Sequence, residues 1–512
     1  MFCGWLGFGG DDSPPAAEEI ISSLDPFQAA ANRGGHTTQV PPLAMAETSR
    51  SSSCGPVVDP DSGNCLVGWL VLNNRIGLCR QLGDAGVRLP PDSGKAGDGS
   101  LVLAGYTRWG RDVVHRLRGE FSFAIWDATR RLVFMARDPT GRRPLYFTHN
   151  GRCLAFASTE AALRGLPGVS DDPNPLWMAN YLVGNPGEAD GPGALTGTRR
   201  LPPGHWAEAS EAGLTQQQYF AFRDDSPWET QLDPDWLHRY RGVLDGVVQR
   251  VCADRASLGV ETSGGLDSST LVALAACERA SAVQTFGYAT TEQESRLILA
   301  TSAKWGVYAN HIFTKWSGGG PDEVRRRRAT LSRIAGHPSR NSSVVGHWDL
   351  MTSAREQGIS TLLSGFGGDE AVTSHAFAAL TEFVEHKAWS LLAMNYPSRP
   401  AFRPIRGAGW LLSTFRARTA EQEGAGRGPS PQRVALVRST LGADFAERVL
   451  SQEAVVSRPT HPIGSETVNR EVLNTLRRRS AMARVEETAQ LATVFGIEYQ
   501  WPLLEVESRD VV

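Results

Sequence analysis

Residues 263–268 have the sequence SGGLDS, and this short stretch sets the expected architecture of the second half of the chain. It follows the apolar run 258–260 and precedes an apolar stretch from Thr270 to Cys277. This order predicts a strand, a glycine-rich turn and the start of a helix. Two glycines let the backbone fold tightly around an anion, and free N–H groups at a helix N-terminus attract phosphate. The stretch therefore predicts a nucleotide phosphate site, and an ordinary Ser/Gly-rich strand–helix turn is the alternative.

The side chains of the same stretch suit that chemistry. Serine hydroxyls add hydrogen-bond donors for phosphate, and an aspartate can hold a magnesium ion. A Walker phosphate loop is excluded, because the Gly-Lys-Ser/Thr ending and its lysine are missing. The residues expected to hold the phosphates are Ser263, Gly264, Gly265, Asp267 and Ser268.

A second glycine-rich stretch, SGFGGDE at 364–370, follows a strand-like run from Ile359 to Leu363. Its acidic pair supplies a second carboxylate, and two carboxylates with phosphate oxygens are the usual way to hold Mg²⁺. Asp369 and Glu370 taken alone are equally explained as a helix N-cap pair. The presence of both motifs, in this order, favours a nucleotide site.

The two motifs resemble those of the asparagine synthetase-like family of ATP pyrophosphatase ligases. The resemblance implies an enzyme that splits ATP between the α- and β-phosphates and forms an acyl-adenylate. It implies Mg²⁺ held by Asp267 and Asp369, with Ser268 beside them in catalysis, and nucleotide contacts from Ser364, Gly365 and Glu294. Glu294 is equally expected as an ordinary glutamate at a helix N-terminus.

Bulk properties place the chain among multidomain globular proteins. Its 512 residues exceed what one hydrophobic core accommodates. A net charge of −3 gives no argument for nucleic acid or a membrane surface as a partner, and no apolar run has membrane-spanning length. The seven cysteines lack CxxC pairs, and no secretion signal precedes the first strand, so we expect a reducing cytoplasm.

The two halves of the chain have different patterns. Residues 1–210 contain short strands and turns, with helices near 100–117 and 176–183 and long loops at 33–63 and 184–198. A polar linker is expected at 211–235. From 236 to 512, helices and strands alternate as in a doubly wound parallel sheet, and the chain becomes mainly helical from about 376. Predicted elements are helix 236–252, strand 257–262, helix 268–279, strand 283–288 and helix 294–305.

The first half resembles the same family, in the segments FSFAIWD (121–127), ARDPTGRRPLY (136–146) and LPPGH (201–205). The resemblance implies an α/β multidomain protein. Its first domain is then an Ntn-hydrolase-type αββα sandwich related to glutaminases. Its second is a PP-loop synthetase domain with a helical C-terminal part.

Glutamine hydrolysis in this family uses an N-terminal cysteine whose thiol is the nucleophile and whose own amine is the base. Here Cys3 follows Phe2, so its nitrogen is an amide and not a base. Asn74 replaces the glycine of the family's NGEIYN segment, and Asp98 is the counterpart of its SDTE aspartate. We expect a catalytically silent domain with Cys3 as a small buried residue; processing that exposes Cys3 is the alternative.

Without ammonia, the amine must belong to the substrate. Family branches that dispense with glutamine close rings, and Phe366 lies where β-lactam synthetases carry a tyrosine. The chain is most similar to lasso peptide cyclases, which join an Asp or Glu side chain of a peptide to its N-terminal amine. This implies a precursor peptide substrate, a leader-peptide recognition protein and a leader peptidase as partners. A glutamine-hydrolysing asparagine synthetase, a β-lactam synthetase-like ligase and a non-catalytic binding module remain alternatives.

Overall fold

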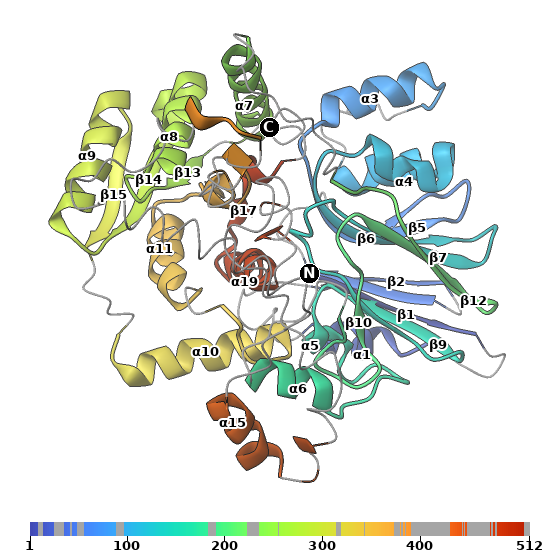
Figure 1. Ribbon diagram of the computed structural model, residues 1–512. Helices are drawn as coiled ribbons and strands as arrows, with labels where there is room; N and C mark the ends of the chain where they lie inside the picture. The colour runs from blue at the N-terminus through green and yellow to red at the C-terminus, as the bar shows by residue number, and fades with distance from the viewer. Residues whose placement is uncertain are drawn as a thin grey trace.

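Within the residues that it describes, the computed structural model contains three β-sheets, two in the first half of the chain and one in the second (Figure 1). The residues it describes are 1–8, 14–24, 35–40, 43–48, 56–88, 97–182, 191–222, 235–253, 255, 257–313, 319–341, 344–372, 379, 382–383, 386–390, 431–442, 444, 446–447, 472, 475–476 and 479–505.

The first two sheets are antiparallel, six-stranded and stacked face to face. Side chains such as Phe2, Val67 and Phe147 fill the space between them. One sheet has the order β10-β8-β9-β1-β3-β2 and the other β12-β11-β7-β6-β5-β4. The first sheet consists of β1 (Phe2–Gly7), β2 (Gly35–Val40), β3 (Leu43–Thr48), β8 (Tyr146–His149), β9 (Cys153–Ala157) and β10 (Arg199–Arg200). The second consists of β4 (Val57–Val58), β5 (Cys65–Leu72), β6 (Gly119–Asp127), β7 (Leu132–Arg137), β11 (His205–Ser210) and β12 (Gly213–Gln218).

Helices cover the outer faces of this sandwich. The helices α3 (Arg75–Asp84) and α4 (Asp98–Trp109) pack on the second sheet through an apolar cluster that includes Leu78 and Leu101. On the first sheet lie α1 (Ala17–Ser22) and α5 (Glu160–Leu163). The layers are therefore αββα, as the family resemblance implied. The two helices predicted in this half are present as α4, extended by a 3₁₀ segment Gly110–Arg116, and α6 (Pro175–Leu182).

Two expected loops contain strands, and these predictions were wrong. The loop predicted at 33–63 holds β2, β3 and β4, and the linker predicted at 211–235 holds β12. β3 is fully buried, because it lies between β1 and β2, whereas β12 is a largely exposed edge strand paired with β11. The polar and Gly/Pro-rich composition concealed both, since backbone pairing with a neighbour stabilises such segments without an apolar pattern.

The third sheet is parallel and has the order β15-β14-β13-β16-β17. Its strands are β13 (Leu258–Glu261), β14 (Val283–Ala289), β15 (Tyr308–Phe313), β16 (Thr361–Leu363) and β17 (Glu498–Gln500). Helices α7 (Trp236–Cys252) and α8 (Leu266–Arg279) pack on one face, and α11 (Val344–Glu356) and α19 (Arg479–Phe495) on the other. With α9 (Glu292–Trp305), the five elements predicted between 236 and 305 are all present. The helices α10 (Pro321–Ala335) and α15 (Pro431–Leu441) belong to the same half, and most of the region from 376 lies outside the described residues.

The strand order changes direction between β13 and β16. From β13 the chain proceeds outward through β14 and β15, then returns to the other side of β13 with β16 and β17. Ligands of open α/β sheets bind at such a switch point, outside the carboxyl ends of the strands. Both glycine-rich motifs begin there, because β13 precedes residues 263–268 and β16 precedes residues 364–370.

Buried ion pairs join the two halves. Arg137 and Arg200 of the sandwich both contact Glu486 on α19, at 2.5 and 2.9 Å. Arg142 contacts Glu505 at 3.0 Å, and all five side chains are almost completely buried. A buried charge is costly unless an opposite charge lies beside it. The arginines of the sandwich and the glutamates of the second half therefore neutralise each other across the interface.

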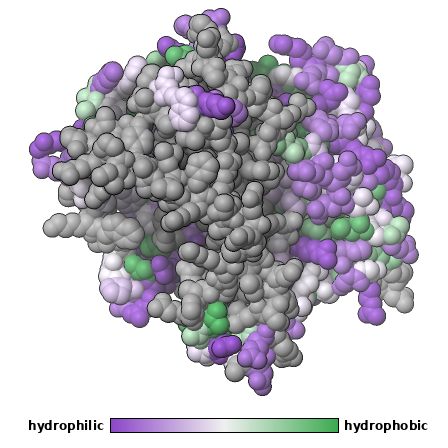
Figure 2. All heavy atoms as spheres, in the orientation of Figure 1, coloured by the Kyte–Doolittle hydropathy of each residue, from purple (hydrophilic) through white to green (hydrophobic). Residues whose placement is uncertain are grey.

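The visible surface of the sandwich, on the right of Figure 2, is mostly hydrophilic with scattered apolar side chains. Within the described ranges, we find no helix with the length and apolar character needed to traverse a lipid bilayer.

Candidate active site

The loop after β13 turns sharply before α8 begins. Gly264 has a φ of +76°, a left-handed conformation that favours glycine. A Cβ at this position would lie 2.7 Å from the Cβ of Leu297 on α9, so space also requires glycine. Gly265 is the N-cap of α8, whose first N–H groups therefore lie at the turn. The strand, turn and helix predicted from the sequence are all present.

Two serines face each other across this turn. The hydroxyl oxygens of Ser263 and Ser268 are 3.4 Å apart, and the Ser263 backbone N–H donates to Ser268 Oγ at 3.3 Å. Ser263 is exposed and Ser268 is buried. Ser263 is therefore accessible to a phosphate, whereas Ser268 holds the turn closed from within.

The loop after β16 lies directly against the first loop. A Cβ at Gly365 would lie 2.9 Å from the backbone nitrogen of Ser268. A Cβ at Gly368 would lie 2.0 Å from Cγ of Asp267. Both glycines thus allow a contact that a side chain would obstruct. The two motifs form one site, although a hundred residues of chain separate them.

Two carboxylates lie at this contact. Asp267 is half-buried against Gly368, and Asp369 is exposed in the π-helical turn Gly368–Val372. Glu370 instead accepts a hydrogen bond from the Gly367 backbone N–H at 2.9 Å and so supports its own loop. The pair fits Mg²⁺, which binds through one or two carboxylates plus substrate phosphate oxygens. Among the described side chains, no group of three or more His, Cys, Asp or Glu offers a separate metal centre.

Glu294 and Ser364 have structural contacts that the sequence left open. Glu294 forms a capping box with Thr291 at the start of α9, and its carboxylate accepts three hydrogen bonds in all, two from Thr290 and one from Thr291, which lower its pKa. Its backbone carbonyl oxygen would lie 3.5 Å from a Cβ at Gly264. The Ser364 hydroxyl is buried and donates to Glu261 at 2.8 Å. Nucleotide contacts from these two side chains stay predictions.

A polar cluster beneath the two loops was not anticipated. Glu261, the last residue of β13, accepts hydrogen bonds from Ser364 and Tyr499 and pairs with His347 Nε2 at 3.1 Å. Burial alone would raise the pKa of Glu261, but His347 and Tyr499 lower it to about 2. We call Glu261, His347, Ser364 and Tyr499 the Glu261 cluster. One signal was visible in the sequence: a single acidic residue ends an otherwise apolar strand just before the phosphate loop.

The guanidinium group of Arg484 lies over the ring of Phe366. The guanidinium carbon of Arg484, on α19, lies 4.3 Å from the ring centroid. Such stacking is attractive because the face of an aromatic ring is electronegative. The second loop therefore contacts β13 through Ser364 and α19 through Phe366, and it is held on two sides.

Cys3 belongs to a strand of the first sheet, and its side chain is not accessible to solvent. It is completely buried on β1, and its sulfur lies 3.1 Å from Ser23 Oγ and 3.5 Å from the Ile20 carbonyl oxygen. Burial raises the pKa of the Cys3 thiol to about 12. Because the thiolate is the reactive form, burial disfavours the state of Cys3 that a nucleophile requires.

The other counterparts of a glutamine site are also engaged. The Asp98 carboxylate is buried, pairs with Arg75 and accepts a hydrogen bond from the Leu72 backbone N–H at 2.9 Å. Asn73 donates to Glu505 of the other half at 3.3 Å. These contacts place Asp98 within the sandwich and Asn73 at the interface between the two halves.

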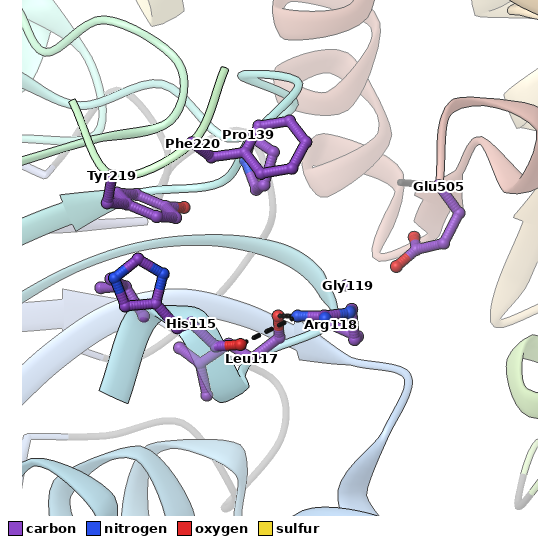
Figure 3. Close-up of a pocket in the computed structure, with 9 residues that line it drawn as sticks. His115, Leu117, Arg118, Gly119, Pro139, Tyr219, Phe220 and Glu505 are labelled. Carbon is purple, nitrogen blue, oxygen red and sulfur yellow. Dashed lines mark hydrogen bonds between the residues drawn. The ribbon is translucent and has the colours of Figure 1, made fainter. Parts of the chain in front are cut away.

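A separate cavity of about 130 Å³ lies between the two halves (Figure 3). His115, Arg118 and Tyr219 of the sandwich line it, and Glu505 forms the opposite wall. Arg118 donates to the carbonyl oxygens of His115 and Leu117. The volume is below the roughly 300–1,000 Å³ of small-molecule pockets, so this cavity does not accommodate a nucleotide.

Known proteins match both halves of the chain. The family profile for asparagine synthase matches residues 239–507, and that for a glutamine amidotransferase domain matches residues 66–220. Glutamine-hydrolyzing asparagine synthetase 3 of Bacillus subtilis is 29% identical over 182 residues, which is 36% of this chain and 29% of the relative. A putative glutamine-hydrolyzing asparagine synthetase of Mycobacterium bovis is 31% identical over 283 residues, 54% of this chain and 42% of the relative. The matches thus span less than half the length of these relatives.

Among solved structures, a glutamine phosphoribosylpyrophosphate amidotransferase from Bacillus subtilis is 13% identical. That similarity covers 71% of this chain and 81% of the other with a TM-score of 0.30, too low to add to the assignment.

Proposed function

The chain belongs to the asparagine synthase family, and from this premise we propose that it is an ATP-dependent, AMP-forming amide ligase. The observation that carries the proposal is the contact of Gly368 with the Asp267 carboxylate at the switch point of the parallel sheet. It joins a phosphate-binding turn to a pair of carboxylates where ligands of such sheets bind. ATP as a substrate also makes the cytoplasm the expected compartment.

In this proposal, some residues of the two loops bind phosphate and others bind Mg²⁺. Ser263, Gly264, Gly265 and the first turn of α8 would bind the β- and γ-phosphates, and Asp267 and Asp369 would hold Mg²⁺. The ion would neutralise charge on the departing pyrophosphate. A substrate carboxylate oxygen attacks the α-phosphorus and the bond to the bridging α–β oxygen breaks. An amine nitrogen then attacks the acyl carbon, loses a proton and displaces AMP. Holding amine and adenylate together removes much of the entropic barrier.

We further propose that the amine belongs to the same molecule as the carboxylate. This proposal is supported by the burial of Cys3, which raises the pKa of its thiol, and by the pairing of Asp98 with Arg75, which both argue against glutamine hydrolysis among the described residues of the sandwich. Phe366 cannot relay a proton, unlike the tyrosine expected of a β-lactam synthetase. The remaining reaction is macrolactam formation: the side chain of an Asp or Glu in a precursor peptide joins the N-terminal amine of that peptide. A leader-peptide recognition protein and a leader peptidase would prepare the substrate.

A second candidate is supported by the names of the matched relatives. Both are described as glutamine-hydrolyzing asparagine synthetases, and a glutamine amidotransferase profile covers much of the sandwich. In that case Cys3 would have to become exposed, and glutamine would be converted to glutamate.

One assay separates these functions. The full chain is incubated with ATP, Mg²⁺ and either a candidate precursor peptide or aspartate plus glutamine. The proposal predicts pyrophosphate and AMP with the peptide, and a peptide product lighter by one water in mass spectrometry. Glutamate formed from glutamine would instead support the asparagine synthetase. Release of ADP and inorganic phosphate would contradict both.

A further inference from the structure

Glu261 lies directly below the site and contacts the second loop at its first residue. Its carboxylate accepts the Ser364 hydroxyl at 2.8 Å, and Ser364 Oγ in turn accepts the Phe366 backbone N–H at 3.2 Å. The Ser364 backbone N–H donates to the Gln500 carbonyl oxygen of β17 at 2.9 Å. The start of the loop is therefore fixed from β13 on one side and β17 on the other.

The Glu261 carboxylate is itself held from three elements. Tyr499 on β17 donates to Oε2, His347 on α11 pairs with Oε1, and the hydroxyl of Ser364 is the third partner. His347 and Tyr499 also contact each other edge to face, with ring centroids 6.3 Å apart. Hydrogen bonds to a charged group are roughly twice as strong as neutral ones, and a carboxylate with three partners is held in one orientation.

From these contacts we propose that Glu261 is a positioning residue of the ligase site. It orients the Ser364–Asp369 loop so that Asp369 and Asp267 can bind the same Mg²⁺ ion. The inference rests on the proposed function, but it concerns metal and nucleotide binding and not the identity of the acyl substrate.

The placement of the loop explains why one hydrogen bond matters. Gly365 touches the Ser268 backbone and Gly368 touches the Asp267 carboxylate, so the second loop has little room to move toward the first. Because the first loop obstructs inward movement, we expect a loop released at Ser364 to move outward and to carry Asp369 away from Asp267. Second-shell partners of metal ligands typically contribute about 10- to 100-fold in metal affinity or activity.

The sandwich reinforces this arrangement through β17. Arg143 donates to the Tyr499 carbonyl oxygen at 3.3 Å, and Glu120 accepts the Trp501 backbone N–H at 3.3 Å. Arg143 and Glu120 are themselves paired at 2.6 Å and buried. The first half of the chain thus holds the strand that carries Tyr499, whatever its own catalytic state.

The test compares Glu261→Gln with the full-length wild-type chain. Binding of a non-hydrolysable ATP analogue is measured by calorimetry over a range of Mg²⁺ concentrations, and pyrophosphate release is measured in parallel. We expect Glu261→Gln to require about 10- to 100-fold more Mg²⁺ for half-maximal binding, with kcat partly restored at saturating Mg²⁺. Glu498→Gln is the matched control, because Glu498 is on the same strand as Tyr499 but pairs with Arg255.

Ser364→Ala is a second, milder variant, and we expect it to keep the fold because it removes only one hydroxyl group. If Glu261 acts through Ser364, this variant shows the same Mg²⁺ shift, and the double variant is no worse than Glu261→Gln alone. An unchanged Mg²⁺ dependence in either single variant, with the wild type binding normally, overturns the inference. A wild-type chain that binds nucleotide but forms no amide overturns the proposed function alone; one that binds no nucleotide overturns both.

Discussion

Gly368 packs its backbone against the carboxylate of Asp267, so that a single methyl group at position 368 would occupy the place of the Asp267 Cγ. The obstructing atoms belong to a side chain and not to the backbone, and a carboxylate can rotate away. Gly368→Ala should therefore fold normally while Asp267 is displaced from its position beside Asp369.

We predict that Gly368→Ala lowers kcat/KM for pyrophosphate release about 100-fold, because a shift of about 1 Å in a reacting geometry costs that much. The unfolding midpoint in urea should change little. Gly242→Ala on α7 is the control, since a Cβ there meets nothing within 4 Å, and it should keep full activity. Equal activity of the two variants would show that the loops are not packed in this way.

The second prediction concerns the two aspartates. Asp267→Asn and Asp369→Asn should each reduce pyrophosphate release roughly 100-fold or more, because a metal ion contributes several kcal/mol of charge stabilisation. If both bind one ion, the double variant should be little worse than either single variant. The control is Asp245→Asn on α7, where Asp245 pairs with Arg241 at the surface. Independent, multiplying defects would mean that the two side chains act separately.

Local patterns predicted the strand–turn–helix unit around residues 263–268 well, for a physical reason. A strand, a glycine-rich turn and a helix start are specified by neighbouring residues, and two such units at a sheet switch point must come together. Gly264 is a glycine because its φ is positive, and Gly368 is a glycine because its backbone lies against Asp267. Both structural requirements are therefore visible in the sequence as glycines.

The Glu261 cluster could not be predicted in the same way. Its hydrogen bonds join residues 103 and 238 positions apart, and no local rule links Glu261 to Ser364 or Tyr499. The strands β2 and β12 were missed for a different reason: each forms a hairpin with the adjacent strand, β2 with β3 and β12 with β11, and backbone pairing, not side-chain periodicity, makes them strands. The contacts between distant residues in the Glu261 cluster could be found only in the structure.

The third prediction concerns the interface between the halves. Burial alone would raise the pKa of Glu486, but Arg200 and Arg137 lower it to about 2, so the carboxylate is charged at neutral pH. Glu486→Gln leaves those guanidinium groups buried without a countercharge and should cost about 3–5 kcal/mol in the free energy of unfolding. Urea unfolding at pH 7 measures it, with Glu208→Gln, at the half-exposed pair with Arg130, as the control. A loss no larger than in that control would mean that the buried pairs do not hold the halves together.

The fourth prediction is a loss of stability in mild acid. His337 is buried with its ring tilted against that of Trp177, and desolvation, with a smaller contribution from Arg340, lowers its pKa from 6.5 to about 3. Between pH 6.5 and 3 the unfolded chain therefore binds a proton that the folded chain does not. This contribution to stability is present above pH 6.5 and is lost as the pH falls toward 3.

From pH 7 to pH 5 we expect His337 to account for a loss of about 2 kcal/mol in the free energy of unfolding. His337→Gln should reduce the pH dependence over this range, whatever its effect at pH 7. Urea titrations of both proteins at the two pH values provide the comparison. An equally steep dependence in the variant would assign the acid sensitivity to other groups.

The fifth prediction tests whether the sandwich domain lacks glutaminase activity. Cys3→Ala replaces a buried thiol by a smaller apolar side chain, so we expect at most a modest loss of stability, about 1 kcal/mol, for the small cavity. Because the thiol is protonated and enclosed, pyrophosphate release with a cyclisable peptide should be unchanged, and neither protein should form glutamate from glutamine. Cys277→Ala, at an exposed position on α8, is the matched control. A glutaminase activity that is present in the wild type and in Cys277→Ala but absent in Cys3→Ala would make Cys3 the nucleophile and return the reaction to ammonia transfer.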